Sequence, residues 1–259
     1  MELSDRHVLV TGGSRGIGLA MAKEFAAAGS RLTLVASGRE ALEKAAAEVG
    51  GRPLAADLAD TNEVNGLVTA AEEQAGAPID IAVLNAGIDV SGAFADLSAA
   101  DVQRLCQLNI TTTIELARQA RASMASRGQG HIVAVSSLSA QVAMPGLATY
   151  AATKAAVSQF IIGVRPELGR DGIRTTLVEI GQVKTDLYAT ARNNPATARA
   201  FDRAVRLGLL RDLEVDEVAR AVVRAVRRNK EMVVLPRRAR FQSVLSHTPQ
   251  LVAHRLFRG

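Results

Sequence analysis

The chain has few aromatic residues and almost no cysteine. Phe, Tyr and Trp together make up 3% of the 259 residues, and Trp does not occur. The apolar fraction of 48% is therefore mainly Ala, Val, Leu and Ile, which suits buried parallel strands packed closely by Ala-rich helices. The single cysteine, Cys106, excludes an internal disulfide and is consistent with a reducing compartment.

Long apolar runs and ligand-like histidine clusters are also missing. No segment approaches the ~20 apolar residues that span a bilayer, and residues 1–5 show no signal-peptide pattern. The four histidines are scattered without metal-ligand spacing, so we expect no metal site. These absences predict a soluble, cytoplasmic protein.

The net charge of +5 is unevenly distributed. Residues 220–259 hold ten Arg or Lys and one acid, Glu231, whereas the rest of the chain has a small excess of acids. Because the body is not basic, we expect no nucleic-acid partner. We separate residues 237–259 as a basic amphipathic C-terminal tail. A solvated face, weak contact with an anionic membrane surface, a lid over the substrate and a subunit contact all stay open for it.

Short β-rich runs alternate with longer Ala-rich helical stretches. Strands are predicted at 7–10, 31–35, 53–56, 79–84, 131–135, 174–178 and 232–235, and helices near 16–28, 39–49, 61–74, 99–127, 149–169 and 215–228. The alternation predicts an α/β fold: a single-domain, doubly wound (Rossmann) parallel sheet of seven strands flanked by helices, over residues 1–236.

Two irregularities stand out in this pattern. The long stretch from Ile180 to about Glu214 has one short predicted helix near 196–207, and we expect its part 187–210 to cover a ligand crevice. Pro166 falls inside the predicted helix 149–169, which predicts a kink near 162–165.

A glycine-rich turn follows the first predicted strand. Residues 11–18 read TGGSRGIG and lead directly into the first predicted helix. Gly12 allows a tight turn, Gly16 lets the backbone approach a pyrophosphate, and Gly18 allows the helix to pack closely on the strand. The free N–H groups of the helix N-terminus then face the anion. This segment predicts a dinucleotide cradle.

A second pattern carries acid–base chemistry. Tyr150 and Lys154 are four residues apart and share one face of a predicted helix. A nearby ammonium favours the phenolate and lowers the tyrosine pKa from its ordinary value near ~10. Ser137 precedes Tyr150 by thirteen residues and can hold a substrate oxygen through its hydroxyl. A cradle combined with an acidified phenol predicts hydride transfer to or from a carbonyl.

With these motifs in their order along the chain, the sequence resembles the short-chain dehydrogenase/reductase family. The glycine spacing 12, 16, 18 and the Tyr150/Lys154 pair carry the resemblance. Further matches are Asp57-Leu58, Leu84-Asn85-Ala86-Gly87, Asn109, Ser136-Ser137 and the segment from Gly181 to Thr185. One departure is Ile180, where the family usually has Pro.

The resemblance implies a role for each matching residue. The catalytic set would be Tyr150 as general acid/base, Lys154 as tuner of its pKa and ligand of the nicotinamide ribose, Ser137 as oxyanion partner and Asn109 as support for a water relay. The cofactor would be bound by Gly12, Ser14, Arg15, Gly16, Ile17, Gly18, Ser37, Arg39, Asp57, Leu58, Asn85, Ala86, Gly87, Tyr150, Lys154, Gly181, Val183 and Thr185.

The residues near the second predicted strand favour NADP(H) over NAD(H). An acid at the end of that strand would accept hydrogen bonds from a ribose 2′-OH, but the position is Ala36. Arg15 and Arg39 lie nearby, and a guanidinium suits a phosphate group. Ser37 stands where the family usually has arginine, so Arg39 would reach back or Ser37 would donate a hydroxyl hydrogen bond.

We therefore predict an NADP(H)-dependent enzyme that acts on a ketone or secondary alcohol. The expected pocket segments, 89–94, 138–144 and 187–210, are largely apolar and favour a lipophilic substrate. A 3-oxoacyl-thioester reductase of lipid synthesis is one alternative. A non-catalytic dinucleotide sensor or scaffold is another. By resemblance, we expect a homodimer or homotetramer that associates through the long helices 99–127 and 149–169.

Overall fold

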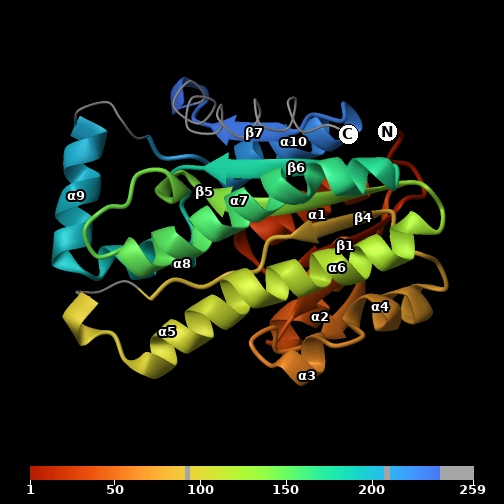
Figure 1. The fold of residues 1–259 in the computed structure, drawn as a ribbon, viewed down its shortest axis with the longest axis horizontal. Coiled ribbons are helices and arrows are strands. Elements are labelled where there is room, and N and C mark those ends of the chain that lie inside the picture. Colours follow the sequence, from red (N-terminus) through yellow and green to blue (C-terminus); the bar gives the residue numbers. More distant parts are fainter. Residues whose placement is uncertain (91–93, 207–210, 240–259) are drawn as a thin grey trace.

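The structure is a computed structural model that describes residues 1–90, 94–206 and 211–239 (Figure 1). Its centre is one parallel sheet of seven strands in the order β3-β2-β1-β4-β5-β6-β7. The strands are β1 (His7–Thr11), β2 (Arg31–Ala36), β3 (Arg52–Ala55), β4 (Ile81–Leu84), β5 (Gly130–Ser137), β6 (Ile173–Ile180) and β7 (Met232–Leu235). The predicted fold class and all seven strand positions are confirmed.

The order of the strands reverses between β1 and β4. The chain proceeds from β1 to β3 toward one edge of the sheet and then from β4 to β7 toward the other. In such sheets a ligand binds outside the carboxyl ends of the strands, at this reversal. The turns after β1 and β4 therefore mark the place where a site is expected.

Helices cover both faces of the sheet. They are α1 (Gly16–Ala27), α2 (Arg39–Glu48), α3 (Thr61–Val64), α4 (Leu67–Ala75), α5 (Ala99–Cys106), α6 (Thr112–Ala125), α7 (Ala148–Arg170), α8 (Asp186–Arg192), α9 (Pro195–Arg206) and α10 (Val215–Arg227). One apolar core joins α1, α2 and α10 to the sheet, and a second joins α4, α6 and α7 to the opposite face. Figure 1 shows α6 and α7 crossing in front of the strands.

Several helices differ from their predicted form. The predicted helix 61–74 is divided into α3 and α4 at Gly66, whose positive φ of 74° interrupts helical backbone. The predicted helix 99–127 contains a π-helical segment, η2 (Gln107–Thr111), between α5 and α6. The short helix predicted near 196–207 is present as α9, whereas α8 was not predicted.

Helix α7 runs through Pro166 without a break in its helical assignment. The kink predicted there stays a prediction. Within the part of the chain that the structure describes, no helix combines the length and the apolar character needed to cross a bilayer. Of the predicted tail 237–259, only a short turn, η4 (Arg237–Ala239), falls inside the described residues.

Candidate active site

The glycine turn between β1 and α1 has the close packing that the sequence predicts. Gly12 has a positive φ of 64°, and Gly18 lies so near that a Cβ added to it would be 2.1 Å from the Gly12 carbonyl oxygen. The N-cap residue, Arg15, makes no side-chain capping bond, and the first turn of α1 contains no acid. The N–H groups at this helix terminus can thus bind an anionic phosphate.

Asn85 ties this turn to the end of β4. Its side-chain amide donates to the carbonyl oxygens of Thr11 at 3.0 Å and Gly12 at 3.4 Å. The Thr11 hydroxyl in turn accepts hydrogen bonds from the backbone N–H groups of Asn85 and Ala86, both at 3.0 Å. Asn85 and Ala86 therefore fix the glycine turn after β1 to the chain that follows β4, at the point where the strand order reverses.

The buried side chain of Asn109 projects from the π-helical segment and clamps the chain after β4. Its Oδ1 accepts from the N–H of Ile88 at 2.9 Å, and its Nδ2 donates to the carbonyl oxygen of Ile88 and to Thr153 Oγ1, both at 3.0 Å. A Cβ on Gly87 would lie 3.3 Å from Lys154 Nζ. The absence of a side chain at Gly87 lets this segment pass close to the lysine.

Tyr150, Lys154 and Ser137 meet at the start of α7 and the end of β5. Ser137 lies near enough to the Tyr150 hydroxyl to lower its pKa, and the Ser137 hydroxyl accepts a hydrogen bond from the Ser139 N–H at 3.1 Å. Lys154 Nζ lies 5.8 Å from the centroid of the Tyr150 ring and donates to the Val135 carbonyl oxygen at 3.0 Å. All three side chains are buried, with 9%, 4% and 9% exposure for Tyr150, Lys154 and Ser137.

Burial dominates the electrostatics of this group. It raises the pKa of Tyr150 above its ordinary value; the Asp89 carboxylate raises it further, and the nearby Ser137 side chain acts in the opposite direction. Burial also lowers the pKa of Lys154 to about 8. The sequence predicts that Lys154 lowers the tyrosine pKa, and burial of the phenol acts in the opposite direction.

The segment after β6 reaches the glycine turn from the other side. A Cβ on Gly16 would lie 3.6 Å from Thr185 Cγ2. Gly181 N donates to the Leu235 carbonyl oxygen at 2.8 Å, and Val183 pairs with Leu213 in an isolated β-bridge. Thr185 thus lies beside the cradle, while Gly181 and Val183 are fixed by backbone contacts to β7 and to the segment before α10.

Four predicted cofactor ligands take no part in the contacts described above between the glycine turn and its neighbouring segments. Arg39 is exposed and pairs with Glu43 at 3.8 Å, and Ser37 is the exposed residue that follows β2. Asp57 Oδ1 accepts from the Ala59 N–H at 3.0 Å, in a turn after β3. Leu58 is buried in the apolar core.

Three further predicted ligands lie in the glycine turn or at the start of α1: Ser14, Arg15 and Ile17. Ile17 packs against the apolar core.

A buried polar network behind Lys154 was not predicted. Ser136 Oγ donates to the Lys154 carbonyl oxygen at 2.9 Å, and Ser158 Oγ lies 2.8 Å from Ser136 Oγ and 3.0 Å from Glu179 Oε1. Gln141 donates to Glu179 Oε2 at 2.7 Å. The available sequence signal was Glu179, an acid within the apolar strand β6, where a charge is costly unless it is hydrogen-bonded.

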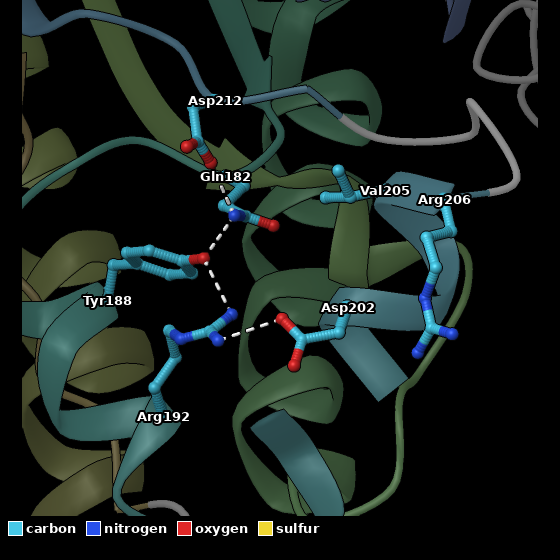
Figure 2. Close-up of a pocket in the computed structure, with 7 residues that line it drawn as sticks. All are labelled: Gln182, Tyr188, Arg192, Asp202, Val205, Arg206 and Asp212. Carbon is cyan, nitrogen blue, oxygen red and sulfur yellow. Dashed lines mark hydrogen bonds and ion pairs between the residues drawn. The ribbon is translucent and has the colours of Figure 1, made fainter. Parts of the chain in front are cut away.

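A second polar group lines a cavity beside α8 and α9 (Figure 2). Gln182 Nε2 donates to Tyr188 Oη and to Asp212 Oδ1, and Arg192 bridges Tyr188 Oη at 3.1 Å and Asp202 Oδ1 at 2.8 Å. None of these residues was among the sequence-predicted site residues, although Tyr188, Arg192 and Asp202 fall within the predicted covering segment.

The residues at the reversal fit a dinucleotide. The turn leaves free N–H groups at a helix N-terminus, Gly16 faces open space apart from Thr185, and the buried Tyr150/Lys154 pair lies beside it. In the described ranges, no group of three or more His, Cys, Asp or Glu side chains is arranged to hold a metal ion.

Comparison with known proteins gives the family. The family model for short chain dehydrogenases matches residues 6–196. A short-chain type dehydrogenase/reductase of Sinorhizobium fredii is 39% identical over 184 residues, which are 71% of this chain and 72% of the relative.

Solved structures agree over nearly the whole chain. A short-chain dehydrogenase from Sphingobium yanoikuyae in complex with NADPH matches with a TM-score of 0.80 at 28% identity, covering 96% of this chain and 95% of that one. The bulky-bulky ketone specific alcohol dehydrogenase from Comamonas testosteroni matches with a TM-score of 0.78 at 26% identity, covering 96% and 94%. The chain therefore belongs to the short-chain dehydrogenase/reductase family and is an oxidoreductase that uses a nicotinamide cofactor and acts on ketone or alcohol substrates.

Proposed function

We propose that the protein transfers a hydride between NADP(H) and a ketone or secondary alcohol, with Tyr150 as the proton donor and acceptor. The observation that carries this proposal is the shared burial of Tyr150, Ser137 and Lys154 where β5 ends and α7 begins, with Lys154 Nζ 5.8 Å from the centroid of the Tyr150 ring. When bound, the nicotinamide supplies or accepts the hydride.

The residues of the chain divide the remaining work. A carbonyl that gains a hydride develops negative charge on oxygen, and Tyr150 can protonate that oxygen because burial keeps its phenol protonated at neutral pH. The Ser137 hydroxyl lies beside the phenol and can hold the same oxygen. Lys154 can return a proton to Tyr150, since burial brings its pKa to about 8. Asn109 is a positioning residue that keeps the chain at Ile88 against Thr153.

The central test is the Tyr150→Phe variant in a screen of ketones, aldehydes, acyl thioesters and secondary alcohols, with NADPH, NADH and their oxidised forms. Loss of a general acid should reduce turnover by about 10²–10⁴-fold. Cofactor binding should remain, because the ring and its packing are kept. Turnover by Tyr150→Phe at the wild-type rate would contradict the assignment. Tight cofactor binding by a wild type that converts none of the compounds would favour the sensor alternative.

The preference for NADP(H) rests on the end of β2. Ala36 is the last residue of this strand, and Ser37 and Arg39 follow at the start of α2, so no carboxylate stands where it would repel a 2′-phosphate. Arg15 at the N-cap of α1 adds a second guanidinium.

We expect the Ala36→Asp variant to reverse this preference. A carboxylate at the end of β2 repels the 2′-phosphate and accepts hydrogen bonds from a ribose 2′-OH. The dissociation constant for NADPH should rise by about tenfold or more, while that for NADH should fall. Cofactor fluorescence titration measures both constants. An unchanged ratio of the two would show that the phosphate does not bind near Ala36.

A further inference from the structure

Most of the residues that line the cavity beside α8 and α9 carry a polar or charged group. Its volume is about 600 Å³, within the range of ~300–1,000 Å³ typical of small-molecule sites. One lining residue, Val205, is apolar, and the others are Gln182, Tyr188, Arg192, Asp202, Arg206 and Asp212. This lining contrasts with the apolar pocket segments expected from the sequence.

Gln182 presents an unused acceptor to this cavity. The residue is 7% exposed, and its Nε2 donates to the Asp212 carboxylate and the Tyr188 hydroxyl. Because a carboxylate only accepts hydrogen bonds, Asp212 determines which way the amide is turned. The carbonyl Oε1 is consequently directed away from Asp212, is buried, and has no hydrogen-bond partner. In Figure 2 it points into the space bordered by Val205 and Asp202.

Arg206 adds a cation that is not committed to an acid. The guanidinium of the other lining arginine, Arg192, is held by Asp202 at 2.8 Å. Arg206 lines the cavity at the end of α9, is exposed, and forms no ion pair with the residues that the structure describes. The two lining carboxylates bond to other groups, Asp202 to Arg192 and Asp212 to Gln182. An anionic group would find a free partner here.

The cavity adjoins the segment after β6 that we expect to bind the cofactor. Gln182 lies between Gly181 and Val183, and its backbone carbonyl accepts from the Leu213 N–H at 2.9 Å, which fixes this wall. On the other side, Tyr188 packs against a small apolar cluster that includes Leu147, three residues before Tyr150. The apolar cluster of Leu147 and Tyr188 thus connects the cavity lining to the start of α7, where Tyr150 lies.

We propose that this cavity binds the far end of the carbonyl substrate, and that this end is a polar head with an acidic group for Arg206 and a hydroxyl or amide N–H donor for Gln182 Oε1. The inference rests on the proposed function, because it takes the reacting carbonyl to lie at Tyr150. It refines the expectation of a lipophilic substrate to that of an apolar chain ending in a polar head.

The test compares three ketones that differ only at the far end: 7-oxooctanoate, 7-oxooctanamide and methyl 7-oxooctanoate. We expect the acid and the amide to bind about tenfold or more tightly than the ester, which has neither a charge nor a donor. The two readouts are isothermal titration calorimetry on the cofactor-free protein and kcat/KM with NADPH. Equal affinities for all three compounds would overturn the proposal without involving any variant.

Two variants then assign the two interactions. Arg206→Gln should weaken binding of the acid about tenfold and leave the ester unchanged, while Gln182→Met should weaken the amide selectively. The matched control is Arg203→Gln, which removes a charge from the same helix at a residue outside the cavity lining. If both variants lost the same affinity for the acid, the effect would come from the overall positive charge of α9, and the proposed site would be refuted.

The two readouts separate this proposal from the proposed function. If the ester is reduced with the same kcat/KM as the acid, the polar-head site is wrong while the oxidoreductase assignment stands. If none of the ketones is reduced but the acid still binds better than the ester in an Arg206-dependent manner, the site stands and the assumed reaction is wrong.

Discussion

At the scale of single residues, burial is the main influence on the protonation state of the side chain. The active-site tyrosine and lysine are both desolvated, which raises the pKa of Tyr150 and lowers that of Lys154 to about 8. Both changes favour the neutral form of the side chain. Burial thus disfavours a permanent ion pair between the two side chains, which suits the proton transfer that we propose for them.

A buried histidine far from this pair follows the same rule. The Thr176 hydroxyl donates to the Lys230 carbonyl oxygen, so at its 2.7 Å contact with His131 it must accept from Nε2–H. His131 Nδ1 is then unprotonated, and it is buried without a partner. Protonation at Nδ1 would place a desolvated charge there, and burial accordingly lowers the pKa of His131 to about 4.

This histidine should make the protein acid-sensitive. The unfolded chain takes up the proton near pH 6.5 and the folded one only near pH 4, so stability is lost as the pH falls through this window. The contribution is of the order of 3 kcal/mol. We expect the free energy of unfolding, measured in urea at neutral pH and near pH 4, to fall less with acid in His131→Gln than in the wild type. The glutamine amide keeps a hydrogen-bond donor for Thr176. Equal losses in variant and wild type would contradict the assignment, because the other buried histidine, His7, is present in both proteins.

For the helices, the contacts of a glycine matter more than its presence. Gly18 in α1 packs against the backbone of the glycine turn, where an added Cβ would meet the Gly12 carbonyl oxygen at 2.1 Å. Gly169 near the end of α7 has nothing within 4 Å of an added Cβ. The same substitution therefore tests packing in one helix and intrinsic helix propensity in the other.

We expect Gly18→Ala to lower the free energy of unfolding by about 1–3 kcal/mol, because the added methyl forces α1 away from the turn. Cofactor affinity should fall with it. Gly169→Ala should be neutral or stabilising by up to about 1 kcal/mol, since Ala is the better helix former. Urea denaturation and cofactor titration measure both effects. If the two variants behaved alike, the close approach of α1 to the turn would not be stabilising.

Across the whole molecule, the parallel sheet gathers residues that are distant in sequence. The carboxyl ends of β1, β4, β5 and β6 bring the glycine turn, the Asn85 segment, Ser137 and the Gly181 segment to one edge. α6 and α7 pack on the same face of the sheet as one apolar layer. From the resemblance to the family, we expect these two helices to pack against those of a second copy of the chain.

Light scattering coupled to size exclusion tests that expectation. The wild type should elute as a dimer or tetramer of the 27.3 kDa chain. Ile114 on α6 is 37% exposed, and Ile114→Glu should shift the mass toward the monomer because a charge is costly in a buried interface. Val142→Glu, at an exposed position outside these helices, is the control. A monomeric wild type would refute association through these helices.

The sequence by itself determined the fold class and the seven strands, and it proposed Ser137, Tyr150 and Lys154 as site residues. These follow from local information: apolar runs of strand length, a glycine turn between strand and helix, and fixed spacing of side chains. Asn109 became a candidate only through the resemblance to the short-chain dehydrogenase/reductase family. The break at Gly66 was also visible in the sequence, but the predicted helix 61–74 passed over it.

Only the tertiary structure decided the π-helical segment at Asn109, the direction of the Tyr150 pKa and the polar cavity. Asn109 bonds to Ile88 and Thr153, twenty-one and forty-four positions away. The tyrosine pKa depends on how completely its neighbours exclude water, and the Gln182 amide is oriented by Asp212, thirty positions away. Such properties arise from contacts between distant parts of the chain, which no local pattern encodes.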